Sequence, residues 1–270
     1  MKIGTTSFGF RYQLLDPARA PSLVDVVVQA AELGLDLLQI CENARPLALA
    51  EFEWDEVVRR ASDLGLEVQL GCKTVDDEEF RRYLGRSERM RSPMLRMVFE
   101  REDGGPPTRE DMDRFLERSW RLLEASGVKL AIENHFDVSS RMLADAVESF
   151  PASQVGFCVD TANSLRNFEP PEQVLGLLGA RAFCYHIKDF AVRGDKLGFV
   201  VEGAPLGQGR LDLDGMLDRI FAADPQPVLL AENWTPSSGV WEEDVVRDAA
   251  WLRRSLAALR AAAESRAVRA

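Results

Sequence analysis

Three stretches of the chain share one pattern: ELGLDLLQI at 32–40, DLGLEVQLG at 63–71 and ASGVKLAIE at 125–133. In each, a glycine closes an amphipathic run and a short apolar run follows. Glycine adopts the left-handed backbone that often ends a helix. Gly34, Gly65 and Gly127 therefore mark points where a helix turns back into a strand, and the repetition predicts βα units around a parallel sheet.

The whole chain continues this alternation. Its apolar runs predict eight strands, at 2–6, 36–40, 67–72, 94–99, 129–133, 155–160, 182–187 and 228–233. Helical patterns lie between them, for example at 22–33, 54–64, 109–126 and 244–262. An open dinucleotide-binding sheet would be expected to carry GxGxxG after its first strand, but only SFGFRY follows. We therefore predict an α/β fold, a single (β/α)₈ TIM barrel over residues 1–270, with a C-terminal tail that frays from about residue 260.

Composition narrows the class of protein. The 270 residues are 46% hydrophobic and 29% charged, as in ordinary globular domains. A net charge of -11 and the lack of a basic cluster argue against nucleic-acid binding. No run reaches the roughly 20 apolar residues of a membrane helix, and the N-terminal run lacks the features of a signal peptide. We expect a cytoplasmic protein with neither nucleic acid nor membrane as a partner.

The four cysteines, Cys41, Cys72, Cys158 and Cys184, are widely spaced and form no CxxC motif. We expect reduced, buried thiols rather than disulfides or soft-metal ligands. The longest stretch without periodicity, 189–210, follows the seventh predicted strand, which places it on the catalytic face of a barrel.

Each of the last four predicted strands ends in a possible metal ligand. The runs LAIENH, GFCVD, FCYHIKD and LLAENW supply Glu133, Asp160, His186 and Glu232. Residues two apart on a strand share a face. We therefore expect an apolar layer beneath the four, formed by Ala131, Cys158, Cys184 and Leu230.

Three carboxylates at the mouth of a barrel would repel one another unless a cation compensates. With one imidazole they suit Mn²⁺, Mg²⁺ or Co²⁺, and zinc stays open. Glu133 and Glu232 could also exchange protons with a substrate carbon from opposite faces. The alternative interpretation is that the four groups are ordinary barrel-end residues paired with Lys and Arg.

The runs IENH, CVDTAN, HIKD, PLGQG and AENW together resemble the xylose isomerase-like barrel superfamily, often called sugar phosphate isomerase/epimerase. The resemblance covers nearly the whole chain. It implies that Glu133, Asp160, His186 and Glu232 bind one divalent metal, often Mn²⁺, and that the two glutamates are catalytic. It also implies a role in carbohydrate metabolism and a possible homo-oligomer.

Branches of this superfamily differ around the histidine. Lys188, two residues after His186, is more similar to the inosose dehydratase branch than to the ketose 3-epimerases. The endonuclease IV branch needs several histidines for three zinc ions, whereas this chain has two histidines, so we exclude it.

Further residues are candidates for substrate binding. They are His135, Lys188, Asn163, Gln39 and Arg210, with Gly207 and Gly209 letting backbone approach a ligand and Phe8 and Trp234 forming an apolar wall. Each has a structural alternative: His135 could only orient a neighbour, Lys188 could pair with a site carboxylate, the glycines could form a turn, and the aromatics could be ordinary packing.

We therefore expect a metal-dependent isomerase or epimerase of a small sugar, sugar phosphate or polyol, acting through an enediolate. The alternative is a dehydratase or lyase that expels a β-hydroxyl from a keto-cyclitol or 3-keto sugar. A silent sugar-binding barrel would not need two glutamates at one carbon.

Overall fold

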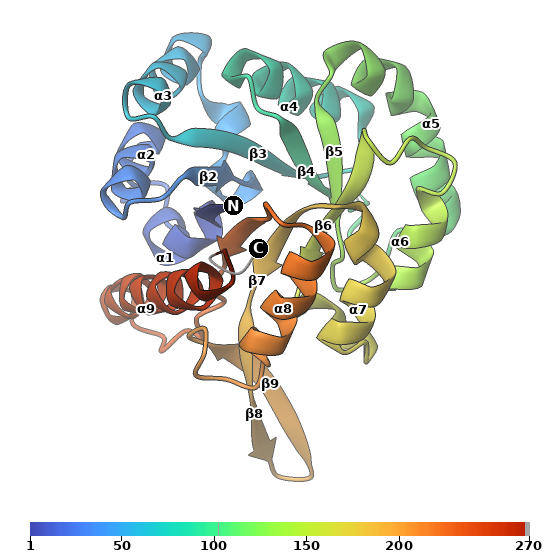
Figure 1. Ribbon diagram of the computed structural model, residues 1–270. Helices are drawn as coiled ribbons and strands as arrows, with labels where there is room; N and C mark the ends of the chain where they lie inside the picture. The colour runs from blue at the N-terminus through green and yellow to red at the C-terminus, as the bar shows by residue number, and fades with distance from the viewer. Residues whose placement is uncertain (102, 268–270) are drawn as a thin grey trace.

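A computed structural model describes residues 1–101 and 103–267 of the chain and shows a closed barrel of parallel strands (Figure 1). The strands are β1 (Lys2–Thr6), β2 (Leu37–Ile40), β3 (Glu67–Lys73), β4 (Met94–Val98), β5 (Lys129–Glu133), β6 (Val155–Asp160), β7 (Ala182–Ile187) and β10 (Val228–Ala231). The first strand pairs with β2 on one side and with β10 on the other, which closes the barrel. The predicted (β/α)₈ TIM barrel is confirmed.

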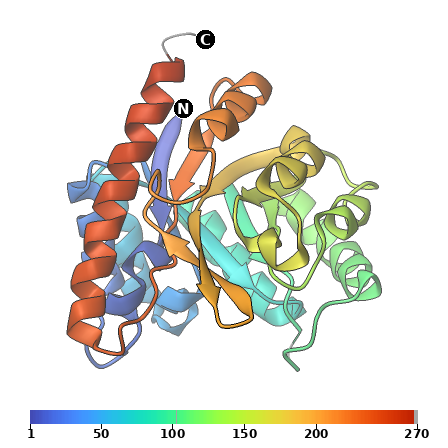
Figure 2. The ribbon, with the colours of Figure 1, turned by 90° about the horizontal axis from the view of Figure 1, so that it is seen from below.

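Helices form an outer layer around the strands (Figures 1 and 2). They are α1 (Arg11–Leu14), α2 (Leu23–Glu32), α3 (Glu51–Asp63), α4 (Asp77–Met90), α5 (Arg109–Ser126), α6 (Ser140–Ala146), α7 (Pro171–Leu178), α8 (Leu213–Ala223) and α9 (Trp241–Ala267). Gly34, Gly65 and Gly127 all have φ near +67°, so their predicted left-handed role is confirmed. None of these helices in the described ranges has the length and apolar character needed to cross a membrane.

The predicted apolar layer inside the barrel is present. Ala131, Cys158, Cys184 and Leu230 are fully buried and pack together with Leu37 and Met94. In the strand register, Cys158 lies opposite Cys184. Two residues further along each strand, Asp160 lies opposite His186. The barrel therefore has a packed floor directly beneath the polar groups at its mouth.

The stretch after β7 differs from expectation. Residues 189–204 are not irregular but form an antiparallel hairpin of β8 (Asp189–Asp195) and β9 (Gly198–Ala204) (Figure 2). The ribbon projects from the barrel, and near its turn Leu197 and Phe199 are largely exposed. Because neither face of that part is buried, its sequence lacks the apolar alternation that would have revealed a strand.

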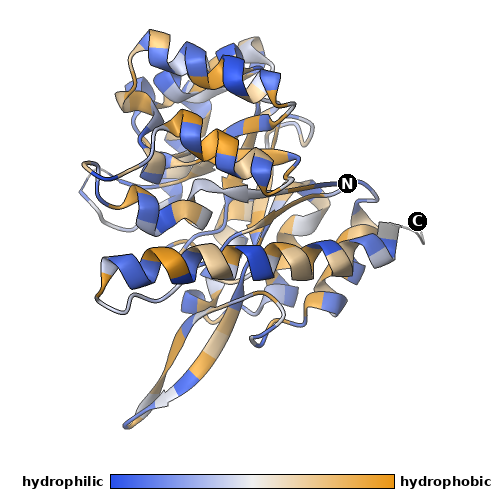
Figure 3. Cartoon of the chain, turned by 90° about the vertical axis from the view of Figure 1, so that its left-hand side faces the viewer, coloured by the Kyte–Doolittle hydropathy of each residue, from blue (hydrophilic) through white to orange (hydrophobic). Residues whose placement is uncertain are grey.

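The last helix extends beyond the point where fraying was expected. Residues 260–267 continue α9, which carries apolar and polar side chains in alternation (Figure 3). Leu256, Leu259 and Ala263 are buried at the helical spacing. Arg266 pairs with Asp214 and Asp218 at the start of α8. Residues 268–270 lie outside the described part of the chain.

Candidate metal centre

The four predicted ligands come together at the carboxyl ends of neighbouring strands. Glu133 ends β5, Asp160 ends β6, His186 lies near the end of β7, and Glu232 directly follows β10. All four are buried, with at most 6% of each residue exposed. Since side chains at matching depth on adjacent parallel strands point the same way, the sequence arrangement brings three acids around one imidazole.

Nδ1 of His186 lies at the centre of the cluster. It is 3.0 Å from Oε2 of Glu232, 3.5 Å from Oε2 of Glu133 and 4.0 Å from Oδ2 of Asp160. Ligand atoms of Asp160, His186 and Glu232 all lie within 4.8 Å of one another, and the same holds for Glu133, Cys158 and His186. Two overlapping groups of three therefore share the histidine.

A chain of amide side chains fixes the orientation of the imidazole. Glu67 can only accept a hydrogen bond when ionised, and Gln69 donates to it over 2.8 Å. Gln39 in turn donates to Gln69 over 3.2 Å, which leaves Oε1 of Gln39 facing Nε2 of His186 at 3.0 Å. Nε2 must therefore carry the proton, and Nδ1 is left to face the three carboxylates.

Three buried atoms at this point have no hydrogen-bond partner within the described residues: Nδ1 of His186, Oδ2 of Asp160 and Oε2 of Glu232. They make ion-pair contacts instead, Nδ1 of His186 with Oε2 of Glu232 at 3.0 Å and Oδ2 of Asp160 with Nζ of Lys188 at 2.9 Å. Burial lowers the pKa of His186, but Cys158, Glu133 and Glu232 together raise it well above the ordinary value. The cluster thus favours positive charge at Nδ1, and its donor set of two carboxylates and an imidazole fits a divalent cation.

Glu133 is held differently from the other acids. Its Oε2 accepts from Arg96 in a buried ion pair, and its Oε1 accepts from Asn163 over 2.8 Å. Arg96 also lies 3.1 Å from Oε2 of Glu42. Burial would raise the pKa of Glu133, but Arg96 and His186 hold it well below the usual range. Each oxygen of this carboxylate therefore accepts one hydrogen bond from a protein group and keeps a second lone-pair direction.

Arg96 is absent from the sequence predictions, although a signal was available. It interrupts the apolar run MLRMV of β4 and lies opposite Ala131, an inward-facing residue of β5. A charged side chain at such a position needs a buried partner.

Lys188 is the second cation of the cluster. Its Nζ lies 2.9 Å from Oδ2 of Asp160, without hydrogen-bond geometry, 2.8 Å from Oε1 of Glu232 and 3.2 Å from Oδ1 of Asn163. Burial would raise the pKa of Glu232, but Lys188 and His186 lower it. Lys188 and Arg96 thus offset part of the carboxylate repulsion, as the alternative interpretation of residues paired with Lys and Arg expected.

Gln39 and Asn163 both make hydrogen bonds within the cluster. Both are buried. The amide of Gln39 contacts His186 and Gln69. The amide of Asn163 contacts Glu133 and Lys188. Both residues therefore position the neighbours they contact.

His135 is half-buried, and its ring lies 4.2 Å from that of Phe136. Burial lowers the pKa of His135 to about 3, so its ring is neutral near pH 7. Within the described ranges, no hydrogen bond joins the ring of His135 to any of the four predicted ligands. Its contact with substrate stays a prediction.

The glycine-rich run PLGQG forms a turn around a buried carboxylate. The amides of Gly207 and Gly209 donate to Oδ2 of Asp189 over 2.9 and 2.8 Å. These amides are therefore occupied, which favours the structural interpretation of the glycines. Arg210 is exposed, and no ion pair in the described part of the chain joins it to the cluster.

A hollow of about 320 Å³ opens beside the cluster. Its walls include Trp234, Phe136 and Val201 of β9, Arg166 stands at its edge, and Asn163 links it to the cluster. Volumes of this order suit small ligands, so the predicted wall of Trp234 lies where a sugar-sized molecule could enter. Phe8 is not among the residues that line it.

The chain is similar to known proteins over nearly its whole length. The 3-oxo-isoapionate decarboxylase of Pectobacterium atrosepticum is 28% identical over 259 residues, which are 95% of this chain and 94% of that protein. The solved structure of the IOLI protein with a binding zinc atom shares 15% identity, with a TM-score of 0.73 over 98% of this chain and 99% of that one. A D-psicose 3-epimerase solved in the presence of D-fructose shares 14% identity, with a TM-score of 0.68 over 97% and 99%. These two structures share the fold. The model of the family described as xylose isomerase-like TIM barrel matches residues 27–255, so the chain belongs to that family.

Proposed function

We propose that this chain is a divalent-metal-dependent enzyme acting on a small keto sugar derivative, and that it decarboxylates a 3-oxo sugar acid. The observation that carries the proposal is the convergence of one imidazole nitrogen and two carboxylate oxygens, from His186, Asp160 and Glu232, which are buried, form no hydrogen bond and lie beside the ammonium of Lys188. The activity named for the relative from P. atrosepticum, which aligns with 95% of the chain, supports the substrate class.

An ion held by His186, Asp160 and Glu232 would act as a Lewis acid toward a substrate carbonyl oxygen. We take the ion to be Mn²⁺, Mg²⁺, Co²⁺ or Zn²⁺. The protein supplies further positive charge through Lys188, which lies beside the same point and can stabilise an oxyanion. Trp234 and Phe136 provide apolar walls that would restrict water around the substrate.

Decarboxylation places modest demands on these residues. The carbon–carbon bond to the substrate carboxylate breaks, its electron pair moves toward the neighbouring carbonyl oxygen, and carbon dioxide leaves. The resulting enolate carbon then takes up a proton. No base has to remove a proton from carbon, so the essential task of the protein is to stabilise negative charge on one oxygen.

The partners of Glu133 favour this reaction over epimerisation. A general base loses its negative charge when it takes up a proton, whereas the buried guanidinium of Arg96 and the amide of Asn163 stabilise Glu133 as an anion. In the proposed reaction Glu133 instead holds Arg96 and Asn163 in place and remains an anion.

Epimerisation through an enediolate is the second candidate. Glu133 and Glu232 extend from β5 and from the end of β10, with Asp160 and His186 between them. Such a placement suits one base and one acid on opposite faces of a carbon. In this case substrate binding would have to draw Arg96 away from Glu133.

The test is incubation of the metal-loaded protein in D₂O with 3-oxo sugar acids, and separately with ketoses and keto-cyclitols. Release of carbon dioxide with one deuterium at the former carboxyl-bearing carbon is the expected result. Deuterium exchange at a stereocentre without mass loss would establish the epimerase instead. Loss of water from a keto-cyclitol would establish the dehydratase.

A further inference from the structure

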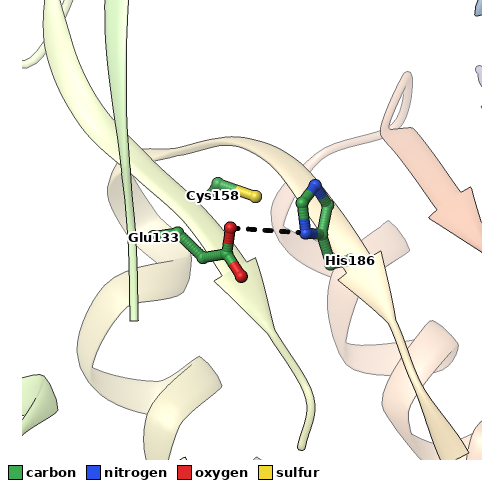
Figure 4. Close-up of side chains that lie close together, drawn as sticks. All are labelled: Glu133, Cys158 and His186. Carbon is green, nitrogen blue, oxygen red and sulfur yellow. Dashed lines mark ion pairs between the residues drawn. The ribbon is translucent and has the colours of Figure 1, made fainter. Parts of the chain in front are cut away.

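We propose that Cys158 gives this metal centre a second, sulfur-containing position that selects thiophilic ions such as Zn²⁺ and Co²⁺. Its ligands are Cys158, Glu133 and His186, whose side chains point toward one another in Figure 4. The inference rests on the proposed function in one respect, because both positions use His186. It contradicts our expectation from sequence that none of the thiols is a metal ligand.

The distances fit a single ion. The sulfur of Cys158, a carboxylate oxygen of Glu133 and a ring nitrogen of His186 all lie within 4.8 Å of one another. Zinc binds sulfur at about 2.3 Å and nitrogen or oxygen at about 2.0–2.2 Å, so the sulfur and another ligand atom of one ion lie at most about 4.5 Å apart. Small side-chain adjustments therefore suffice to bring the three atoms onto one ion.

Burial and hydrogen bonding point the same way. Cys158 and His186 are fully buried, and Cys158 is a free thiol. Nδ1 of His186 has no hydrogen-bond partner among the described residues, and it lies 3.5 Å from Oε2 of Glu133. That oxygen accepts from Arg96, but a carboxylate oxygen has two lone-pair directions, so one remains for an ion.

The two positions differ in the ions that they favour. The group of Asp160, His186 and Glu232 offers only oxygen and nitrogen, which suit Mn²⁺ and Mg²⁺. The group with Cys158 adds a thiolate, which favours softer ions. Binding there expels the thiol proton to solvent as the metal–sulfur bond forms, so charge and atoms balance.

Sharing His186 makes the positions mutually exclusive, because one nitrogen lone pair serves one ion. Cys158 precedes Asp160 by two residues on β6, so the sulfur-containing position lies deeper in the barrel and further from Lys188. A thiophilic ion should therefore compete with Mn²⁺ and withdraw the histidine from the outer position.

The experiment is a Co²⁺ titration of the full chain freed of metal, followed by absorption. Thiolate ligation should give an intense near-ultraviolet charge-transfer band. Cys158→Ser should lose this band. Cys184→Ser is the matched control, since Cys184 lies opposite Cys158 in the same buried layer but outside the ligand group, and it should keep the band.

Affinities provide an independent readout. Zn²⁺ affinity should fall at least about tenfold in Cys158→Ser. Loss of a residue that only hydrogen-bonds a metal ligand already costs about tenfold, and loss of a ligand should cost no less. Mn²⁺ affinity, measured by electron paramagnetic resonance, should not change. Should the serine variant fail to fold, ¹¹³Cd resonance of the wild-type protein replaces it, and a shift typical of sulfur ligation is expected.

Three results would each overturn the inference while leaving the proposed function intact. They are bound Co²⁺ without the charge-transfer band, a band that persists in Cys158→Ser, and a ¹¹³Cd shift typical of oxygen and nitrogen ligands only. Mn²⁺ binding in the absence of any Zn²⁺ or Co²⁺ binding would do the same. Failure of Co²⁺, Zn²⁺ and Mn²⁺ to bind would overturn both the inference and the proposed function.

Discussion

Two buried aspartates at the mouth of the barrel, Asp160 and Asp189, are partnered in opposite ways. Asp189 accepts four backbone amides, from Phe190 and Leu211 on one oxygen and from Gly207 and Gly209 on the other. Asp160 accepts two amides on Oδ1, while Oδ2 is left without a hydrogen bond. A carboxylate with hydrogen bonds on both oxygens organises a loop, whereas Oδ2 of Asp160, which contacts Lys188 without a hydrogen bond and lies beside an imidazole, can bind a ligand.

The largest effect is expected at Asp160. Asp160→Asn preserves size and the amide contacts of Oδ1 but removes the charge at the unpartnered oxygen. Turnover should fall about a hundredfold or more, as for loss of other groups that stabilise developing charge. Because Lys188 keeps its contacts with Glu232 and Asn163, the free energy of unfolding should fall by no more than about 3–5 kcal/mol, the cost of breaking a buried ion pair. Steady-state kinetics and urea unfolding measure the two quantities, and unchanged turnover would remove Asp160 from the site.

Asp189 should show the converse behaviour. Asp189→Ala leaves four amides without their acceptor, each unsatisfied group costing roughly 1–3 kcal/mol if it stays buried. We expect a loss of about 3 kcal/mol or more in urea unfolding. Metal affinity of the protein that remains folded at low temperature should be retained. A variant that is as stable as wild type would refute the structural role.

Gln39 tests how the histidine is oriented. Gln39→Leu removes the acceptor for Nε2–H of His186, so metal affinity should fall about 10- to 100-fold, the range for lost partners of metal ligands. Gln69→Leu, one step further along the chain of amides, is the matched control and should lose less. Equal losses in calorimetric titrations of the two variants would contradict the proposed orientation of the ring.

Asp248 extends the comparison to a third buried aspartate, with the smallest expected effect. Thr235 donates to its Oδ1, and burial raises its pKa to about 6. The unfolded value is about 3.9, so the folded protein holds a proton that the unfolded chain releases. The contribution of Asp248 to stability is therefore full below about pH 4, falls as pH rises to about 6, and is constant above.

The measurement is urea unfolding of Asp248→Asn and wild type from pH 4 to 8. The variant should gain about 1–3 kcal/mol relative to wild type across that range. A constant difference between the two proteins would show that the carboxyl group does not titrate there.

The sequence predicted most of the frame and part of the site. Four strands agree residue for residue, and the other four differ by one or two residues at one end. Side-chain parity placed Glu133, Asp160, His186 and Glu232 on the inner face of the barrel above a correctly predicted floor, because alternation along a strand is a local property.

The hydrogen-bond and ion-pair partners of the site residues come from distant parts of the chain, and the sequence did not predict them. The pairing of Glu133 with Arg96 joins β5 to β4, and the chain from Glu67 to His186 crosses the barrel. The glycines at 207 and 209 follow a motif typical of ligand loops, yet their amides bind Asp189. Residue type and spacing cannot distinguish these partners, since the contacts depend on closure of the barrel.

The central claim is that one divalent ion binds at His186 together with Asp160 and Glu232. Titration of metal-free protein with Mn²⁺, followed by electron paramagnetic resonance, tests it most directly. Wild type should bind one Mn²⁺ ion per chain, and Asp160→Asn should bind it at least about tenfold more weakly. No bound Mn²⁺, or equal affinity in the two proteins, would contradict it.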